Sequence, residues 1–131
     1  MRLNDQTQKA LRALVALAHH GRTMTTEELA NSYDISTSSL GRILRQLQAR
    51  GWISCQRGRH GGVVLIKPST EITVADVLYA FDTIADTDVI KLVNDPDSHG
   101  DFVTMQSKFD ELSKQFMAAL AGITIASLCN R

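Results

Sequence analysis

Residues 35–67 read ISTSSLGRILRQLQARGWISCQRGRHGGVVLIK, and the apolar pattern changes halfway along this stretch. In the first half, four apolar residues recur at helical spacing, Ser36 stands where a helix cap belongs and Gly51 stands where a helix-ending glycine belongs. In the second half, two short apolar runs flank RGRHGG, which is typical of a β-hairpin. The stretch therefore predicts a helix followed by a hairpin. The inward-facing helical residues are Leu40, Ile43, Leu44 and Leu47.

Two more helices are predicted upstream of this stretch. Residues 4–20 carry one broad apolar stripe that ends at Gly21, and residues 26–33 form a short helical pattern capped by Thr25 or Thr26. A turn at 34–36 separates the second helix from the third. The order helix, helix, turn, helix, hairpin is that of a winged helix-turn-helix domain.

Charge is distributed unevenly along the chain. The 131 residues carry 14 basic and 14 acidic side chains, yet residues 1–67 hold ten Lys/Arg and four Asp/Glu, whereas the remainder holds four and ten. No acidic residue lies between Asp34 and Glu71. A basic stretch of this kind is expected to face a polyanion, with a solvated basic surface as the alternative.

Nucleic acid is the polyanion that these elements fit. A helix enters the major groove of DNA, and a cationic hairpin tip enters the neighbouring minor groove. RGRHGG lacks the spacing and the lysine of a phosphate-binding loop and is not followed by a helix, so nucleotide chemistry is not expected. The predicted DNA-binding residues are Thr37, Ser38, Ser39, Arg42, Arg45, Gln46, Arg57, Arg59, His60 and Gly61.

The run from residue 35 to 82, ending in ITVADVLYAFD, resembles the Rrf-two family of bacterial winged-helix transcriptional regulators, which includes NsrR and IscR. The opening MRLNDQTQKALRALVALA is similar to the first helix of that family. The resemblance covers about the first 85 residues closely, and its most specific element is R-G-x-x-G-G before an apolar strand. It implies that Ser38 and Arg42 read bases and that Arg57 is the wing arginine that enters the minor groove.

The chain departs from that family at two places. Gly41 stands where relatives place a larger side chain in the recognition helix. Cluster-binding relatives also carry three cysteines after the wing, whereas residues 86–102, DTDVIKLVNDPDSHGDF, contain none. We therefore expect no cofactor and no iron–sulfur cluster of the usual kind. The acidic segment is interpreted as a flexible loop, with a site for a harder metal as the alternative. Its candidate ligands are Asp95, Asp97, His99 and Asp101.

Only two cysteines occur, Cys55 and Cys129, which exclude a disulfide framework and a four-cysteine zinc site within one chain. Cys55 lies two residues before Arg57 on the first predicted wing strand, where cations could lower the pKa of the thiol and favour oxidation. This makes Cys55 a candidate redox sensor. The alternative, which we favour, is a small apolar residue packed beside Ile53.

The C-terminal segment carries an apolar stripe in steps of three and four residues, typical of a helix that pairs with another helix. We expect a homodimer with crossed long helices, and docking on the chain's own first helix is the alternative. A dimer would read a roughly palindromic site. The predicted interface residues are Phe102, Met105, Phe109, Leu112, Phe116 and Ile123.

These patterns predict a mainly α protein with a small β-hairpin. A winged helix-turn-helix DNA-binding domain is expected at 1–85, an acidic linker and candidate sensor loop at 86–101, and a dimerisation helix at 102–131. The predicted function is that of a dimeric repressor that binds double-stranded DNA and responds to a redox or small-molecule signal. We expect a cytoplasmic protein with no enzymatic activity, no metal and no membrane contact. The alternative function is a protein-interaction module that binds an acidic partner.

Overall fold

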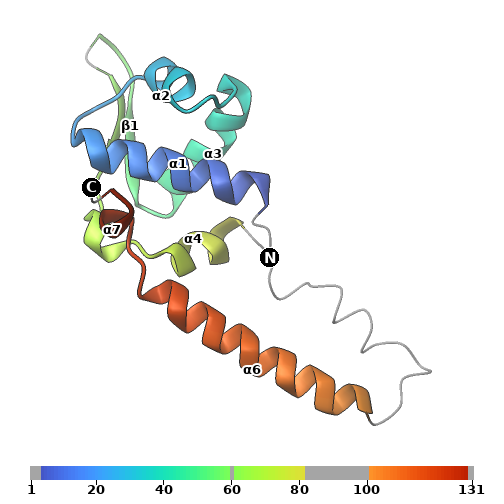
Figure 1. Cartoon of the computed structure of the whole chain (residues 1–131). Coiled ribbons are helices and arrows are strands. Elements are labelled where there is room, and N and C mark those ends of the chain that lie inside the picture. Colours follow the sequence, from blue (N-terminus) through green and yellow to red (C-terminus); the bar gives the residue numbers. More distant parts are fainter. Residues whose placement is uncertain (1–3, 60, 82–100, 130–131) are drawn as a thin grey trace.

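The computed structural model describes residues 4–59, 61–81 and 101–129 (Figure 1). The elements follow one another as three helices, a two-stranded sheet, a short 3-10 helix, a fourth helix and a C-terminal pair of helices. Their bounds are α1 Asp5–His20, α2 Thr26–Ser32, α3 Thr37–Ala49, β1 Ile53–Gln56, β2 Gly62–Leu65, η1 Ser69–Glu71, α4 Val74–Phe81, α6 Asp101–Ala121 and α7 Ile125–Cys129. The predicted order of helices and hairpin is confirmed.

The first three helices begin at side-chain caps that the sequence encodes locally. Asn4 accepts a hydrogen bond from the amide of Thr7 at 2.7 Å, and Ser36 accepts one from the amide of Ser39 at 3.2 Å. Thr25 and Glu28 form a reciprocal capping box at the start of α2. Each cap satisfies amides that the first turn of a helix leaves without a partner.

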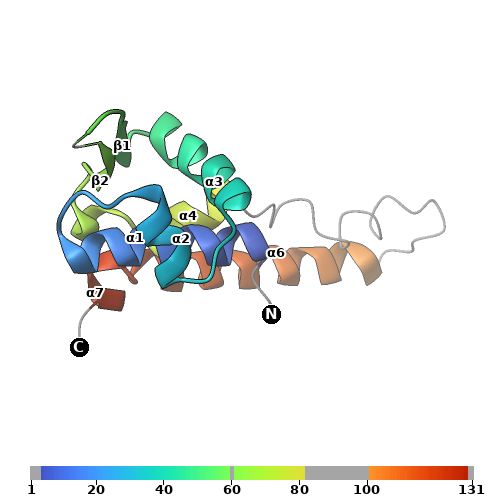
Figure 2. The same ribbon diagram turned by 90° about the horizontal axis from the view of Figure 1, so that it is seen from above.

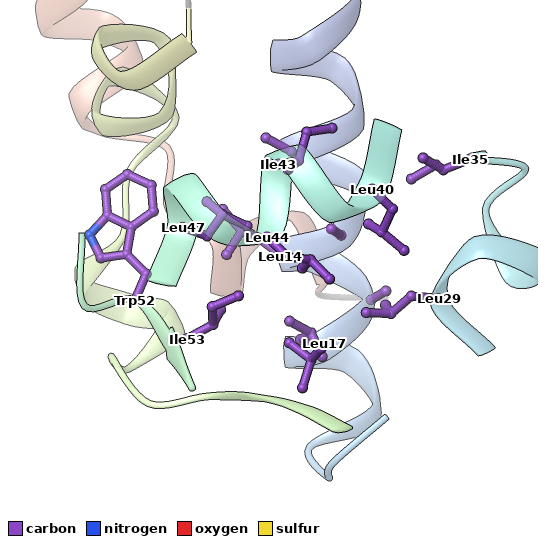
Figure 3. Close-up of a cluster of buried hydrophobic side chains, with 14 of the residues drawn as sticks. Leu14, Leu17, Leu29, Ile35, Leu40, Ile43, Leu44, Leu47, Trp52 and Ile53 are labelled. Atoms are coloured by element: carbon purple, nitrogen blue, oxygen red, sulfur yellow. The ribbon is translucent and has the colours of Figure 1, made fainter. Parts of the chain in front are cut away.

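The core forms where α3 lies across α1 (Figure 3). Every inward residue predicted for α3 is buried, and Leu14 and Leu17 of α1 meet them from the other side. Ile35, at the turn between α2 and α3, is only 4% exposed, and its amide donates to the carbonyl of Ala30 at 3.0 Å. The turn is thereby tied to the core, which fixes the angle between the two helices.

The strands pair antiparallel, with Ile53 opposite Leu65 and Gln56 opposite Gly62. The hairpin is also anchored to the segment before α2 through an isolated bridge between Met24 and Val63. Met24, Ile53 and Val63 are buried in the main core, so the hairpin base belongs to the same core as the helices.

The C-terminal segment differs from the prediction of one continuous helix over 102–131. α6 ends at Ala121, and α7 begins at Ile125 after a turn. Thr124 caps α7 by accepting from the amide of Ser127 at 3.1 Å, and the amide of Ile125 donates to the carbonyl of Ile72 at 2.8 Å. A helix cap and a β-bridge between Thr73 and Thr124 break the helix where the apolar spacing alone continued it.

Docking of the C-terminal segment on the first helix, which was the alternative expectation, is seen for α7. Ile125 is fully buried in the main core, and the Cys129 thiol donates to the carbonyl of Val15 at 3.4 Å. Met117, near the end of α6, packs with residues of α4 in a second cluster. In Figure 1, α4, α6 and α7 lie below α1 and α3 crosses behind it, and Figure 2 shows α3 and the hairpin on one side of α1 and α7 on the other.

Candidate nucleic-acid interface

α3 presents a polar face because its large apolar residues all lie in the core. The predicted base-reading side chains Ser38 and Arg42 are exposed, and Ser39 is half-buried at the edge of the face. In the described part of the chain, Arg42 forms no ion pair and is available to an external anion. The remaining predicted residues of this helix, all exposed, are Thr37, Arg45 and Gln46.

The hairpin tip holds Arg57 and Arg59 in solvent. Both are exposed, and neither has an ion-pair partner among the described residues. The chain reverses at Gly58, which has a φ of 108°, and the amide of Gly61 donates to the carbonyl of Gly58 at 3.0 Å. His60, the third predicted cation of the tip, lies outside the described residues.

The last two glycines of RGRHGG are packed closely against other backbone atoms of the protein. A Cβ at Gly61 would collide with the carbonyl oxygen of Gln56, and a Cβ at Gly62 would come within 2.5 Å of the carbonyl oxygen of Met24. Gly61 is one of the predicted DNA-binding residues. The structure adds a second reason for this glycine, because only glycine leaves room for the tight return of the chain.

Cys55 is exposed on β1, opposite Val63. The favoured expectation, a packed apolar residue beside Ile53, is therefore wrong. The expected lowering of its pKa is also not found, because partial burial raises the pKa of the Cys55 thiol and no cation offsets that effect. At neutral pH the group is an accessible thiol.

A lysine that is not among the predicted DNA-binding residues lies beside the polar face of α3. Lys9 of α1 pairs with Asp5 at 2.7 Å, and its Nζ lies 3.5 Å from Oγ of Ser39. No local sequence pattern predicts that Lys9 lies near Ser39, because the two residues come together only when α3 packs across α1. A second unpredicted contact places the guanidinium of Arg50 5.8 Å from the ring centroid of Trp52, just after α3.

The predicted dimer residues are only partly described. The backbone of α6 includes Phe102, Met105 and Phe109, but their side chains are outside the described set. Leu112 is 58% exposed and Phe116 is 37% exposed, whereas Ile123 lies in the turn after α6 rather than on it. Among the described side chains of α6, Leu112 and Phe116 are therefore two large apolar groups that face solvent in the single chain.

The acidic segment predicted at 86–101 falls outside the described residues except for Asp101, whose backbone begins α6. Within residues 4–59, 61–81 and 101–129, no three side chains of the metal-binding types gather into a site. None of the helices in that part of the chain combines the length and the apolar character needed to cross a bilayer.

Among solved structures, IscR of T. potens has a TM-score of 0.77 and 19% identity, covering 98% of this chain and 85% of that one. The oxidized form of CymR from Staphylococcus aureus has a TM-score of 0.78 and 18% identity, covering 100% and 98%. CymR of B. subtilis, described as its global cysteine regulator, has a TM-score of 0.75 and 18% identity, covering 98% and 96%. At these identities the likeness concerns the fold.

The curated relative Protein aau3 of Rhizobium meliloti (strain 1021) is 40% identical over 79 residues, which make up 60% of this chain. The match spans about half of that relative's own length, at 51%. The model of the Rrf2 family, described as "Iron-dependent Transcriptional regulator", matches residues 3–131. This match extends through the C-terminal helices, beyond the first 85 or so residues over which the resemblance to the Rrf-two family is close. The chain therefore belongs to the Rrf2 family of transcriptional regulators.

Proposed function

We propose that the protein regulates transcription by binding double-stranded DNA, with α3 in the major groove and the hairpin tip in the adjacent minor groove. The observation that carries this proposal is the exposure of the arginines of α3 and of the hairpin tip, on two elements that lie side by side on one side of α1 (Figure 2). The acid-free stretch between Asp34 and Glu71 supplies both elements, so the surface they form carries no carboxylate of its own. Such a surface suits a duplex with one phosphate charge every few ångströms.

The two elements have different tasks in this proposal. Ser38 and Arg42 lie in the first two turns of α3, where a helix in the major groove approaches base edges, and they read sequence. Arg57, at the end of β1, enters the narrower minor groove, and Arg59 strengthens the attraction of the tip to the backbone. Arg45 and Gln46, one to two turns further along α3, contact phosphate or flanking bases.

The assembly we propose is a homodimer through α6. This helix has 21 residues, and Leu112 and Phe116 remain exposed after its C-terminal end has packed on α4 through Met117. Two copies would cover these side chains with each other and present two α3 helices to a roughly palindromic operator. Sedimentation of the wild type and of a Leu112→Glu, Phe116→Glu variant tests this, since the variant should be monomeric while remaining folded.

Repression under control of a redox or small-molecule signal is the regulatory role that we propose. Cys55 is the residue through which an oxidant would act, because it is exposed and lies two positions from Arg57, and the raised pKa of its thiol means that oxidation should become faster as the pH rises. A sulfenic or sulfinic group there would add polarity or negative charge next to the tip. Peroxide should abolish DNA binding by the wild type and spare the Cys55→Ser variant, whereas equal sensitivity of both would refute this route.

The decisive experiment for DNA binding compares Arg57→Ala with Lys108→Ala, an exposed cation on α6 away from the proposed interface. Duplexes that the wild type retains from a randomised pool provide the ligand, and fluorescence anisotropy gives the affinity. Arg57→Ala should cost roughly 1–3 kcal/mol, and Lys108→Ala should be nearly neutral. Retention of no duplex by the wild type would refute the function and favour binding of an acidic protein.

A further inference from the structure

A small polar cleft lies between the first turns of α1 and the start of α3. It has a volume of about 80 Å³ and contains Lys9, Ser39 and Arg42 together with a carboxylate, Asp5. Gln6 and Ile43 complete its lining. An amine, an amide and a hydroxyl therefore converge on one space, which is a donor set that a phosphate group accepts, and the base-reading Arg42 adds positive charge to the same lining.

The lysine is held in place rather than extended into solvent. The Lys9 side chain is only 21% exposed, because Asp5 binds its amine at 2.7 Å and the Ser39 hydroxyl lies 3.5 Å away. Asp5 itself is 78% exposed. The amine is thus already positioned beside α3, so little conformational entropy remains to be lost when an anion arrives.

The position of the cleft relative to α3 suggests which anion. An α-helix with its side chains is about 10–12 Å wide and the major groove is about 12 Å wide, so the phosphates at the groove walls lie against the flanks of an inserted helix. Ser39 and Arg42 are on α3 itself, whereas Lys9 approaches from α1 on one flank. A phosphate of the groove wall would meet this cleft.

We propose that this cleft binds one backbone phosphate of the DNA, with Lys9 exchanging its Asp5 partner for the phosphate. This inference rests on the proposed DNA binding and adds a positioning contact from outside the helix-turn-helix and the wing. Asp5 competes with the phosphate for the same amine. Asp5 therefore weakens DNA binding only while Lys9 is present to bind the phosphate.

The test uses the full chain and the duplex retained by the wild type. Lys9→Gln should weaken binding about threefold to tenfold and reduce the slope of log K against log salt by about 0.9, the value for one phosphate contact. The matched control is Arg12→Gln, which removes an exposed cation from the same helix outside the cleft. Circular dichroism establishes that each variant is folded, which is expected because a surface pair contributes little stability.

Two further measurements separate a specific contact from general attraction. In a double-mutant cycle, Asp5→Asn should tighten binding in the wild type and have a smaller effect in the Lys9→Gln background. Replacing single phosphates by neutral methylphosphonates should reveal one position at which the replacement weakens binding by the wild type clearly more than binding by Lys9→Gln. Together these results would identify the phosphate that occupies the cleft.

The outcomes distinguish this inference from the function on which it rests. If Lys9→Gln and Arg12→Gln have equal effects, with no coupling to Asp5, the cleft binds no phosphate although DNA binding stands. If Arg57→Ala and Lys9→Gln both leave affinity unchanged on a duplex that the wild type retains, both the wing contact and the cleft are refuted.

Discussion

Met24 and Val63 are joined by two backbone hydrogen bonds, one in each direction. The amide of Met24 donates to the carbonyl of Val63 at 2.8 Å, and the amide of Val63 donates to the carbonyl of Met24 at 2.7 Å. Both residues are buried, at 1% and 2% exposure. The pair links the segment before α2 to the second strand of the hairpin, so the wing and the helix-turn-helix share a rigid connection at this point.

Gly62→Ala should disrupt that connection. Gly62 has a φ of 148°, and a Cβ there would come within 2.5 Å of the Met24 carbonyl oxygen and 2.9 Å of Cγ2 of Thr23. The backbone must move, because these are short contacts with main chain and a β-branched side chain. We expect the free energy of unfolding in urea to fall by about 1–3 kcal/mol. Unchanged stability would mean that the Met24–Val63 bridge is absent in solution.

Gly41→Ala should have the opposite effect. Gly41 is inside α3, and a Cβ there meets nothing within 4 Å, so alanine adds helix propensity without a clash. The free energy of unfolding should rise by about 1 kcal/mol. A loss of DNA affinity in the same variant would show that the space above Gly41 is used by the ligand. A loss of stability would instead reveal a contact inside the protein.

Ile125→Ala tests whether the end of the chain belongs to the core. Ile125 is fully buried against the main cluster, so truncation should cost about 2–5 kcal/mol of unfolding free energy. Leu128, on the same short helix but 47% exposed, provides the control, and Leu128→Ala should stay within about 0.5 kcal/mol. Equal and small losses would mean that α7 is undocked in solution.

The reactivity of Cys55 should depend on pH in one direction. Its pKa is raised by partial burial, so the thiol is protonated at neutral pH and thiolate accumulates only above the ordinary range for cysteine. Alkylation by iodoacetamide, followed by mass spectrometry in a Cys129→Ser background, should keep accelerating from pH 7 to beyond pH 9. A plateau below pH 8 would show a lowered pKa and an activated thiol.

The elements whose signals are local could be predicted from the sequence. The cap at Ser36, a cap at Thr25 or Thr26 and the four inward residues of α3 act within one or two turns, and the structure contains them, with Thr25 as the cap of α2. The end of α6 at Ala121 does not follow from the apolar spacing, because that spacing continues through the turn into α7. The cap at Thr124 forms together with a bridge to Thr73, a contact between residues far apart in the chain.

In the candidate site too, residues with local sequence signals could be predicted, and residues placed by the packing of distant elements could not. The exposed side chains of α3 and the tip arginines follow from periodicity and charge, so the sequence was sufficient to select them. Lys9 could not be selected, because its relation to Ser39 depends on how two helices cross. The exposure of Cys55 could not be predicted from the sequence either, because exposure on a two-stranded sheet depends on which elements cover each face.

The docking of α7 on α1 has a consequence for the order of folding. Cys129 and Val15 are 114 positions apart, yet they are in contact, and Ile125 fills the same core as Leu14. During synthesis the first helix therefore lacks part of its packing until residue 129 has left the ribosome. The helix-turn-helix and the hairpin can assemble earlier, because their contacts join residues that are closer together in the sequence. Docking of α7 on α1 joins residues far apart in the sequence, so it is slower and completes the domain last.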